Sequence, residues 1–221
     1  VDGYPVGTFW SYKFIGLNPI DGGPVFEDWE DRAAEVNNQD NYYAYTHMLV
    51  PTGKREPDVT GSINNTFTYK EWRLGFSLVY NFGARTRLFR IFDGYVNGFS
   101  AEDNFNRDFI SRWRKPGDEQ HTNIPALMST FSNEYFDYAS HYTSSGFFYG
   151  PKLDADAYTR YDYSDVRTVN AGYVKLSSVY LTYEFDTKLL KRWHMGRLAL
   201  TLSAYNLYTF CNKQLRGQTP T

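Results

Sequence analysis

The strongest pattern in the chain is an alternation of apolar and polar residues with a period of two. Between Trp72 and Gly83, six successive alternate positions are apolar or aromatic, and the intervening positions are mainly small or polar. Side chains of a β-strand point alternately to its two faces, so this pattern predicts a strand with one apolar and one polar face. The same alternation predicts further strands at 8–16, 60–70, 174–185 and 197–209.

Short and long connections alternate between these predicted strands. Only Lys70 and Glu71 separate the second strand from the third, which predicts a tight hairpin, and 186–196 joins the last two. The segments 17–59 and 86–173 are far longer. We expect a short helix in the charged stretch 27–38. We expect another within 100–115, where Phe105, Phe109 and Trp113 recur at helical spacing before Lys115-Pro116-Gly117-Asp118.

This spacing places both short connections at one end of the sheet and the long segments at the other. Compact soluble domains rarely carry connections this long, whereas outer-membrane barrels combine short periplasmic turns with long extracellular loops. Strands of about ten residues are also long enough to cross a bilayer when tilted. The fold predicted is therefore all-β, an antiparallel transmembrane β-barrel segment whose apolar face meets lipid and whose polar face lines the lumen. Five strands cannot close such a barrel, so we expect residues 1–221 to be part of a larger one.

Composition narrows the classes of function. The chain has 23 basic and 25 acidic residues, a near balance that argues against a nucleic-acid binder. Aromatic residues make up 19% of the chain, which is too many for a disordered protein. No run of about 18 apolar residues is present, which excludes a transmembrane helix. A single cysteine, Cys211, excludes a disulfide framework and a four-cysteine zinc site.

Several segments carry distinctive sequence motifs. They are 61–70 with 74–83, 106–118 with its RWRKPGD motif at 112–118 followed by Ile124-Pro125, 174–183, and 200–210 with NLYTF at its end. These segments resemble the SusC/RagA family of TonB-dependent outer-membrane transporters. Their order and spacing are similar to the last quarter of that family. The resemblance implies a 22-stranded barrel with a plug, powered by TonB and capped by a SusD-like surface lipoprotein, in the outer membrane of a Gram-negative bacterium. It implies import of oligosaccharides or, in some members, peptides, and no enzymatic activity.

Compared with that family, residues 1–221 correspond to the C-terminal part of the barrel, without the plug, the TonB-contacting segment or the last strand. The tyrosines of the long outer segment are candidate substrate contacts, because aromatic faces stack on sugar rings and their hydroxyls form hydrogen bonds. The alternative is that they pack the loop on itself or on a lid protein. The candidates are Tyr135, Tyr138, Tyr142, Tyr149, Tyr158, Tyr161 and Tyr163. The predicted lumen-facing residues are Asn64, Thr66, Asn81, Ser203 and Tyr205.

Other chemical sites are weakly indicated. The carboxylates of Asp154, Asp156, Asp162 and Asp165 could gather around calcium, but no EF-hand pattern is present and a solvated loop is the better interpretation. The four histidines show no metal-ligand spacing, no catalytic motif is present, and no cofactor is expected. Arg85, Arg87 and Arg90 either solvate a strand end or bind lipopolysaccharide phosphates, and solvation is favoured.

Two alternative functions use the same residues. A soluble secreted β-rich carbohydrate-binding module would present the same aromatic side chains and would fold alone. A secreted glycoside hydrolase is weaker, because no pair of carboxylates stands out among the many acids. The partners expected for the transporter are TonB, a SusD-like lipoprotein, membrane lipid with lipopolysaccharide, and an oligosaccharide or peptide cargo, for which the family and the aromatic loop favour a glycan.

Overall fold

The structure, a computed structural model, describes residues 3–27, 41–91, 106–128, 133 and 157–220. The chain divides into two compact units. We call Val1–Gly53 with Arg87–Val169 the loop unit, and Lys54–Thr86 with Asn170–Thr221 the sheet unit. Each unit is described separately.

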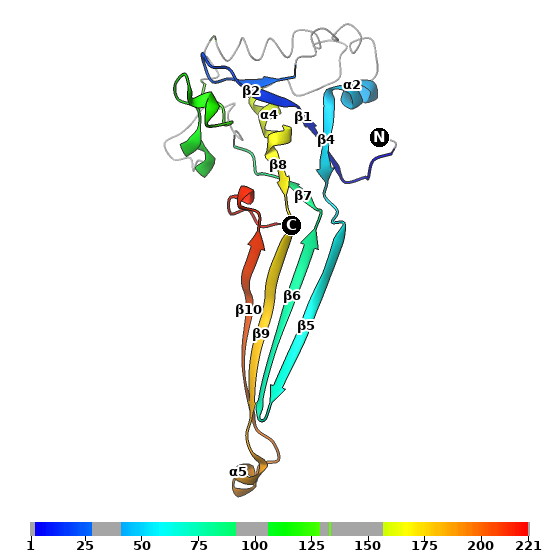
Figure 1. The fold of residues 1–221 in the computed structure, drawn as a ribbon, viewed down its shortest axis with the longest axis vertical. Helices are drawn as coiled ribbons and strands as arrows, with labels where there is room; N and C mark the ends of the chain where they lie inside the picture. Colours follow the sequence, from blue (N-terminus) through cyan, green and yellow to red (C-terminus); the bar gives the residue numbers. More distant parts are fainter. Residues whose placement is uncertain (1–2, 28–40, 92–105, 129–132, 134–156, 221) are drawn as a thin grey trace. The chain divides into compact units, whose positions relative to one another are not determined.

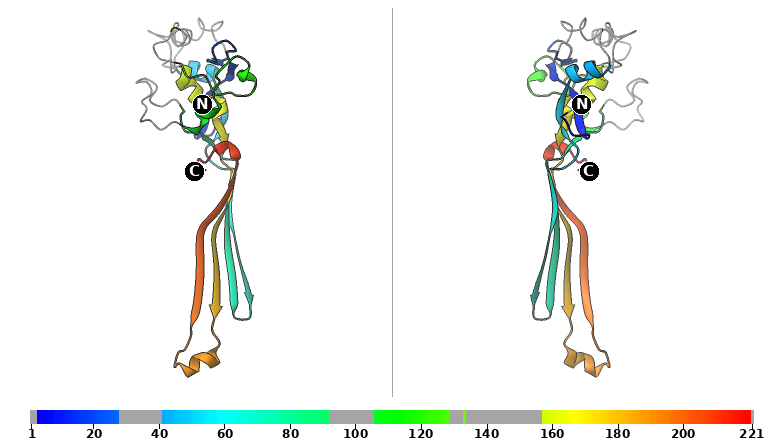
Figure 2. Two further views of the ribbon diagram at one scale, coloured as in Figure 1. Left: turned by 90° about the vertical axis from the view of Figure 1, so that its left-hand side faces the viewer. Right: turned by 90° about the vertical axis from the view of Figure 1, so that its right-hand side faces the viewer.

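The sheet unit is built on four long antiparallel strands. They are β5 (Val59–Tyr69), β6 (Trp72–Phe82), β9 (Tyr173–Glu184) and β10 (Ala199–Cys211), in the spatial order β10-β9-β6-β5 (Figure 1). These are four of the five strands that the alternation predicts, with ends within about two residues of the expected ones. Views along the sheet show its strands as a single layer over most of their length (Figure 2).

Both short connections lie at one end of this sheet, as the sequence predicts. Tyr69 pairs with Trp72 across a two-residue turn, in which Lys70 adopts the left-handed conformation with φ of 50°. Glu184 pairs with Ala199 at the same end, and their connection contains the short helix α5 (Thr187–Arg192). The ladders β5–β6 and β9–β10 finish at the opposite end, so the segment between β6 and β9 leaves the sheet there.

The register of the sheet changes once, near its middle. Ser77 pairs with Ser178 but Leu78 pairs with Leu176, so β9 contains an extra residue, Ser177. The ladder between β9 and β10 shifts at the same level, where Asn206 has φ of 53°. Such bulges bend a strand and increase its twist while the flanking residues keep their pairing.

The loop unit contains short strands and helices. Strand β1 (Thr8–Tyr12) pairs with β4 (Leu49–Lys54), β2 (Phe14–Leu17) with β3 (Pro24–Phe26), and β7 (Arg85–Arg87) with β8 (Thr168–Asn170), the last pair lying where the two units meet along the chain. The helices are α2 (Asn41–Met48) and α4 (Ala157–Asp162), with 3₁₀ turns η3 (Arg107–Ser111), η4 (Asp118–Gln120) and η5 (Asp165–Arg167). A further 3₁₀ turn, η6 (Lys213–Leu215), follows β10 in the sheet unit. The loop unit has its own aromatic core, formed by Tyr12, Phe26, Phe109, Trp113, Ile124, Tyr158 and Tyr161 together with smaller side chains.

The predicted strand 8–16 is wrong as a member of the long sheet. Its residues form β1 and β2, which belong to separate two-stranded sheets and are interrupted at Lys13. The break is held by Asp165, whose carboxylate accepts the Phe14 amide at 3.0 Å and pairs with Lys13 at 3.4 Å. Both faces of β1 are covered, because Tyr12 and Ser11 are each buried. The alternation of apolar and polar residues in 8–16 therefore belongs to a strand that packs against protein on both faces.

The helix predicted within 100–115 is also shorter than expected in its described part. Asn106 caps η3 by accepting the Asp108 amide, and the chain becomes extended at Arg112. Phe109 and Trp113 nevertheless enter the same core, and the Trp113 indole lies against Gly22, where φ is 72° and a Cβ would overlap the ring. The predicted helix 27–38 lies outside the described residues. None of the helices in the described ranges is long and apolar enough to span a membrane.

Candidate functional site

One face of the four-stranded sheet is apolar on all four strands, apart from Asn65 near the middle of β5. The register aligns its side chains in rows across all four strands, for example Phe67, Leu74, Leu181 and Leu202, or Ile63, Leu78, Leu176 and Tyr208. These side chains lie on the surface of the described structure: 54% of Ile63 and 74% of Leu202 is exposed. Monomeric soluble proteins rarely expose an apolar surface that extends across a whole sheet.

Aromatic side chains form two bands at the two ends of this apolar face. Tyr69, Trp72, Tyr183 and Phe185 gather at the turn end, with the Trp72 and Tyr183 rings 4.8 Å apart. Tyr80, Phe82, Tyr208 and Phe210 gather at the opposite end, with the Tyr208 and Phe210 rings 4.5 Å apart. At about 3.3 Å per residue, Trp72 and Phe82 are about 33 Å apart along β6, or about 25 Å after a tilt of about 40°. That is the height of the lipid-facing band of an outer-membrane barrel.

The opposite face of the sheet is polar, and it brings together the predicted lumen-facing residues. Asn64 lies in one row with Ser77, Ser178 and Tyr205, and Thr66 lies in the adjacent row with Gly75, Tyr180 and Ser203. Asn81 lies on the same face nearer the end of β6, opposite Tyr173. Its Oδ1 atom is buried without a hydrogen-bond partner among the described residues.

Tyr180 is a feature of this face that the sequence analysis did not single out. Its ring lies over Gly75, where an added Cβ would overlap the ring carbons. Its hydroxyl forms a hydrogen bond of 3.0 Å with the Thr66 hydroxyl, two strands away. Because Gly75 has no side chain, the tyrosine can lie flat across the sheet. The signal in the sequence is a glycine at an alternate polar position of a long strand.

Most charged side chains of the polar face lie near the turn end, and Lys175 lies in the row beyond the middle, toward the opposite end. Glu184 pairs with Arg197 and, at 4.0 Å, with Arg73. The next two rows toward the middle of the sheet carry no charged residue: they contain serine, threonine, asparagine, glycine and tyrosine. The middle of this face therefore offers mainly hydroxyl and amide groups, which both donate and accept hydrogen bonds.

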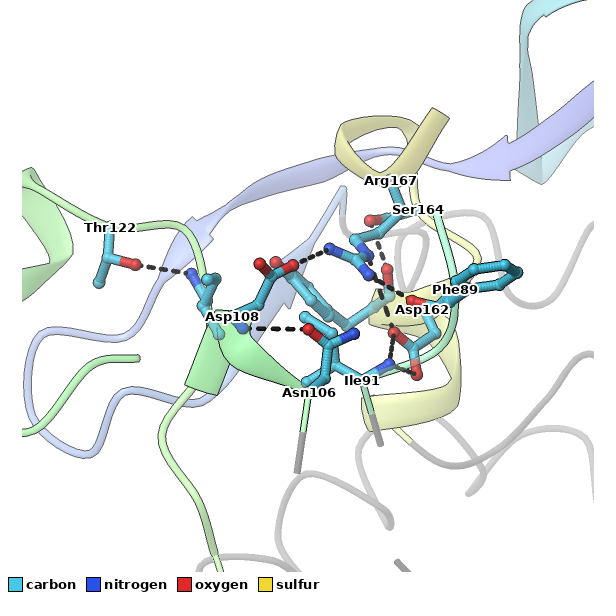
Figure 3. Close-up of polar contacts among 10 residues, drawn as sticks. Phe89, Ile91, Asn106, Asp108, Thr122, Asp162, Ser164 and Arg167 are labelled. Carbon is cyan, nitrogen blue, oxygen red and sulfur yellow. Dashed lines mark hydrogen bonds and ion pairs between the residues drawn. The ribbon is translucent and has the colours of Figure 1, made fainter. Parts of the chain in front are cut away.

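The loop unit contains a cluster of buried charges (Figure 3). Arg167, only 3% exposed, pairs with Asp108 at 3.2 Å and with Asp162 at 3.8 Å. It also donates a hydrogen bond of 2.6 Å to the Phe89 carbonyl, and Asp162 accepts the Ile91 amide at 3.0 Å. We call Arg167, Asp108 and Asp162 the ionic cluster. It connects three segments that are far apart in the sequence.

The loop tyrosines differ in their surroundings. Tyr135, Tyr138, Tyr142 and Tyr149 lie outside the described residues. Tyr158 is buried, and its hydroxyl donates to the Ala126 carbonyl at 2.7 Å. Tyr161, 1% exposed, packs edge-on against Phe14. Tyr163 keeps part of its surface exposed and contacts two guanidinium groups.

Those guanidinium groups belong to Arg87 and Arg90, which pack against protein groups. Arg87 lies 4.8 Å from the Tyr163 ring centre and donates to the Trp10 carbonyl and the Ser11 hydroxyl. Burial lowers the pKa of Arg87, and the neighbouring tyrosines Tyr163 and Tyr12 oppose that shift. Arg90 donates to the Tyr163 hydroxyl. Free solvation is therefore wrong for Arg87, whose guanidinium is held inside the loop unit.

The predicted aspartate cluster divides in the structure. Asp154 and Asp156 lie outside the described residues, Asp162 belongs to the ionic cluster, and Asp165 binds Lys13 and the Phe14 amide. Within the described ranges, no three histidine, cysteine, aspartate or glutamate side chains come together as a possible metal site.

The chain is similar in fold to three solved structures. They are the RagAB peptide transporter (16% identity, TM-score 0.59), and the RagAB peptide importer in its open-open state (17%, 0.56) and its closed-closed state (18%, 0.55). The matches cover 96%, 100% and 96% of this chain and 20%, 21% and 21% of those chains. The chain thus spans about a fifth of the length of the solved chains it matches. No protein-family model matches it, and no curated protein sequence does.

The likeness at this identity concerns the fold, which is mostly antiparallel β with few helices. The structures matched are transporters rather than enzymes.

Proposed function

We propose that this chain is a wall segment, with its attached outer loops, of a SusC-like TonB-dependent transporter in the outer membrane of a Gram-negative bacterium. The transporter imports oligosaccharides or peptides together with a SusD-like surface lipoprotein and is not an enzyme. Residues 1–221 correspond to the C-terminal part of its 22-stranded barrel, without the plug, the TonB-contacting segment and the last strand. The fold match to RagAB and the sequence resemblance both support this assignment.

The exposed apolar face of the sheet is the observation that carries the proposal. Its side chains are arranged over the height of a membrane core, with an aromatic band at each end. In water such a surface would drive aggregation, whereas in a bilayer hydrocarbon covers it. A soluble carbohydrate-binding module is disfavoured for this reason, because the described part of the sheet unit provides no second layer over this face.

The polar face would then line the lumen. Its uncharged middle rows suit a cargo that is rich in hydrogen-bonding groups, a description that fits both a sugar chain and a peptide backbone. Of the three candidate tyrosines that the structure describes, Tyr158, Tyr161 and Tyr163, only Tyr163 keeps exposed surface for contact with cargo. Contacts from Tyr135, Tyr138, Tyr142, Tyr149 and Tyr161 stay predictions.

Neighbouring cysteines on β10 test the assignment of the two faces. The full-length protein that contains this chain is expressed in an outer membrane with Cys211→Ser, and carries either Leu202→Cys or Ser203→Cys. A water-soluble maleimide is expected to label the Ser203 variant and leave the Leu202 variant unlabelled until detergent is added. Leu202 is 74% exposed, so a soluble module would be labelled at both positions, and that result would overturn the proposal.

The cargo is tested separately. The transporter is purified with its lipoprotein from cells grown on a mixture of oligosaccharides and peptides, and the co-purified molecules are identified by mass spectrometry. A bound oligosaccharide or peptide supports import of that class. If neither class is recovered after the complex has been exposed to saturating concentrations of both, the proposed cargo is contradicted.

A further inference from the structure

A cavity of about 600 Å³ lies at the end of the sheet opposite the short turns. Its lining comes from the ends of β6 and β10, the start of β9 and the η6 turn. Phe82, Tyr208 and Phe210 contribute aromatic surface, and each is about half exposed or more. Lys213 and Arg216 contribute positive charge from the turn.

The described residues that line this cavity carry positive charge. These thirteen residues include Lys213 and Arg216 and no aspartate or glutamate. The aromatic residues belong to one of the two bands of the apolar face, so cationic and aromatic groups meet where the apolar surface ends. Anionic lipid headgroups are attracted to basic residues at this kind of boundary.

The η6 turn is ordered in a way that holds these cations beside the strands. The Asn212 side chain accepts the Gln214 amide at 2.9 Å and so caps the turn. Leu215 is buried, and its carbonyl accepts the Gln218 amide at 2.8 Å. Lys213 and Arg216 flank this buried leucine, so their backbone positions are fixed before any ligand arrives.

We propose that this cavity binds a phosphate-bearing membrane lipid. Its phosphate lies at Lys213 and Arg216, and its acyl chain follows Phe82, Tyr208 and Phe210. The inference rests on the proposed membrane location of the apolar face. A lipid fits better than a soluble phosphate ion because an ion would use the two cations alone and would gain nothing from the adjoining aromatic surface.

Native mass spectrometry of the full-length protein in detergent tests the site. The probes are phosphatidic acid, diacylglycerol with the same acyl chains, and inorganic phosphate. We expect Lys213→Gln/Arg216→Gln to weaken phosphatidic acid binding about thirty-fold, as expected for two cations near a membrane surface. The control Lys188→Gln/Arg192→Gln removes two exposed cations from α5, at the other end of the sheet, and should leave this binding unchanged. Equal binding by both variants would overturn the proposal.

Cys211 gives a second readout in the unmodified protein, because it also lines the cavity and is exposed. Its rate of alkylation, followed by mass spectrometry of its peptide, should fall several-fold with phosphatidic acid and remain unchanged with diacylglycerol. Protection by inorganic phosphate alone, to the same extent, would contradict a lipid site. The maleimide experiment distinguishes failure of the lipid site from failure of the proposed function. If the proposed function is wrong, maleimide labels the Leu202→Cys variant in the membrane; if only the lipid site is wrong, that variant stays unlabelled.

Discussion

The two units of this chain differ in which side chains they bury and which they expose. The loop unit buries Arg167, Asp162 and Ser11, each at most 3% exposed, whereas the sheet unit exposes leucines and aromatic rings on a whole face. The buried charges are acceptable because each has partners of opposite charge or backbone groups. Exposed leucines in water have no such compensation, so the difference supports the proposal that hydrocarbon covers the apolar face of the sheet, whereas water and protein surround the loop unit.

The largest effect is expected at the ionic cluster. Arg167→Ala would leave Asp108 and Asp162 buried without their cation, which should destabilise the loop unit by about 3–5 kcal/mol. Hydrogen exchange of the Ile91 amide, which donates to Asp162, reports the loss directly.

Lys13→Ala is the control for this substitution. The Lys13–Asp165 pair has a half-exposed lysine side chain, so its removal should cost about 1 kcal/mol or less. Similar effects of the two substitutions on exchange would show that the ionic cluster contributes no more than a surface pair.

The second prediction compares the two faces of β5 near its middle. Ile63→Arg places a charge in the apolar row, and about 2–4 kcal/mol of stability should be lost if that row faces the bilayer core. Asn64→Arg, one residue further on the polar face, should change stability by about 0.5 kcal/mol or less. Unfolding of the full-length protein from phospholipid vesicles measures both. Equal, small changes would indicate that both faces meet water.

The third prediction concerns the tyrosine that lies flat on the polar face. Gly75→Ala forces the Tyr180 ring away and breaks its hydrogen bond to Thr66, at an expected cost of about 1–3 kcal/mol. Gly16→Ala in β2 is the matched control, since no atom lies within 4 Å of an added Cβ there. The double variant Gly75→Ala/Tyr180→Ala should recover part of the loss, and no recovery would mean that the ring is not the cause.

The smallest effect is a pH dependence at Glu119. Its carboxylate accepts hydrogen bonds from its own amide, the Trp113 indole and the Gly117 amide, which lower its pKa. A lowered pKa means that this stabilisation is fully present above the pKa of the unfolded chain and is lost as the pH falls through the folded value. Protection factors of the amides across 113–124, which correct for the slower intrinsic exchange in acid, should therefore fall as the pH decreases. Glu119→Gln should flatten that dependence, whereas Glu71→Gln in the hairpin should leave it unchanged.

The sheet was predictable because its signal repeats. Each of its four strands carries its own period-two pattern of apolar and polar residues. This pattern depends only on the two faces of that strand, so it can be recognised without knowing which strands lie beside it. The register between strands was harder to predict. The extra residue Ser177 shifts the pairing of β9 with β6, while the alternation of apolar and polar residues continues before and after it.

The loop unit was harder to predict because its contacts are distant in the sequence. Lys13 interrupts a strand through a bond to Asp165, and no local signal links the two residues. The same holds for Arg167 and Asp108. Tyr161 looked like a surface aromatic in a polar segment, and only the tertiary core explains its burial.

The two outer strands of the sheet have a consequence for how such a protein is made. In the described structure, β5 and β10 each pair on one side only, so roughly every second residue directs its amide and carbonyl away from the sheet. Each such group left unbonded in hydrocarbon costs several kcal/mol. If the sheet lies in a bilayer as proposed, inserting it with both outer strands unpaired would therefore be prohibitively unfavourable. Assembly of the proposed barrel would then require neighbouring strands to pair with β5 and β10 as the sheet enters the membrane.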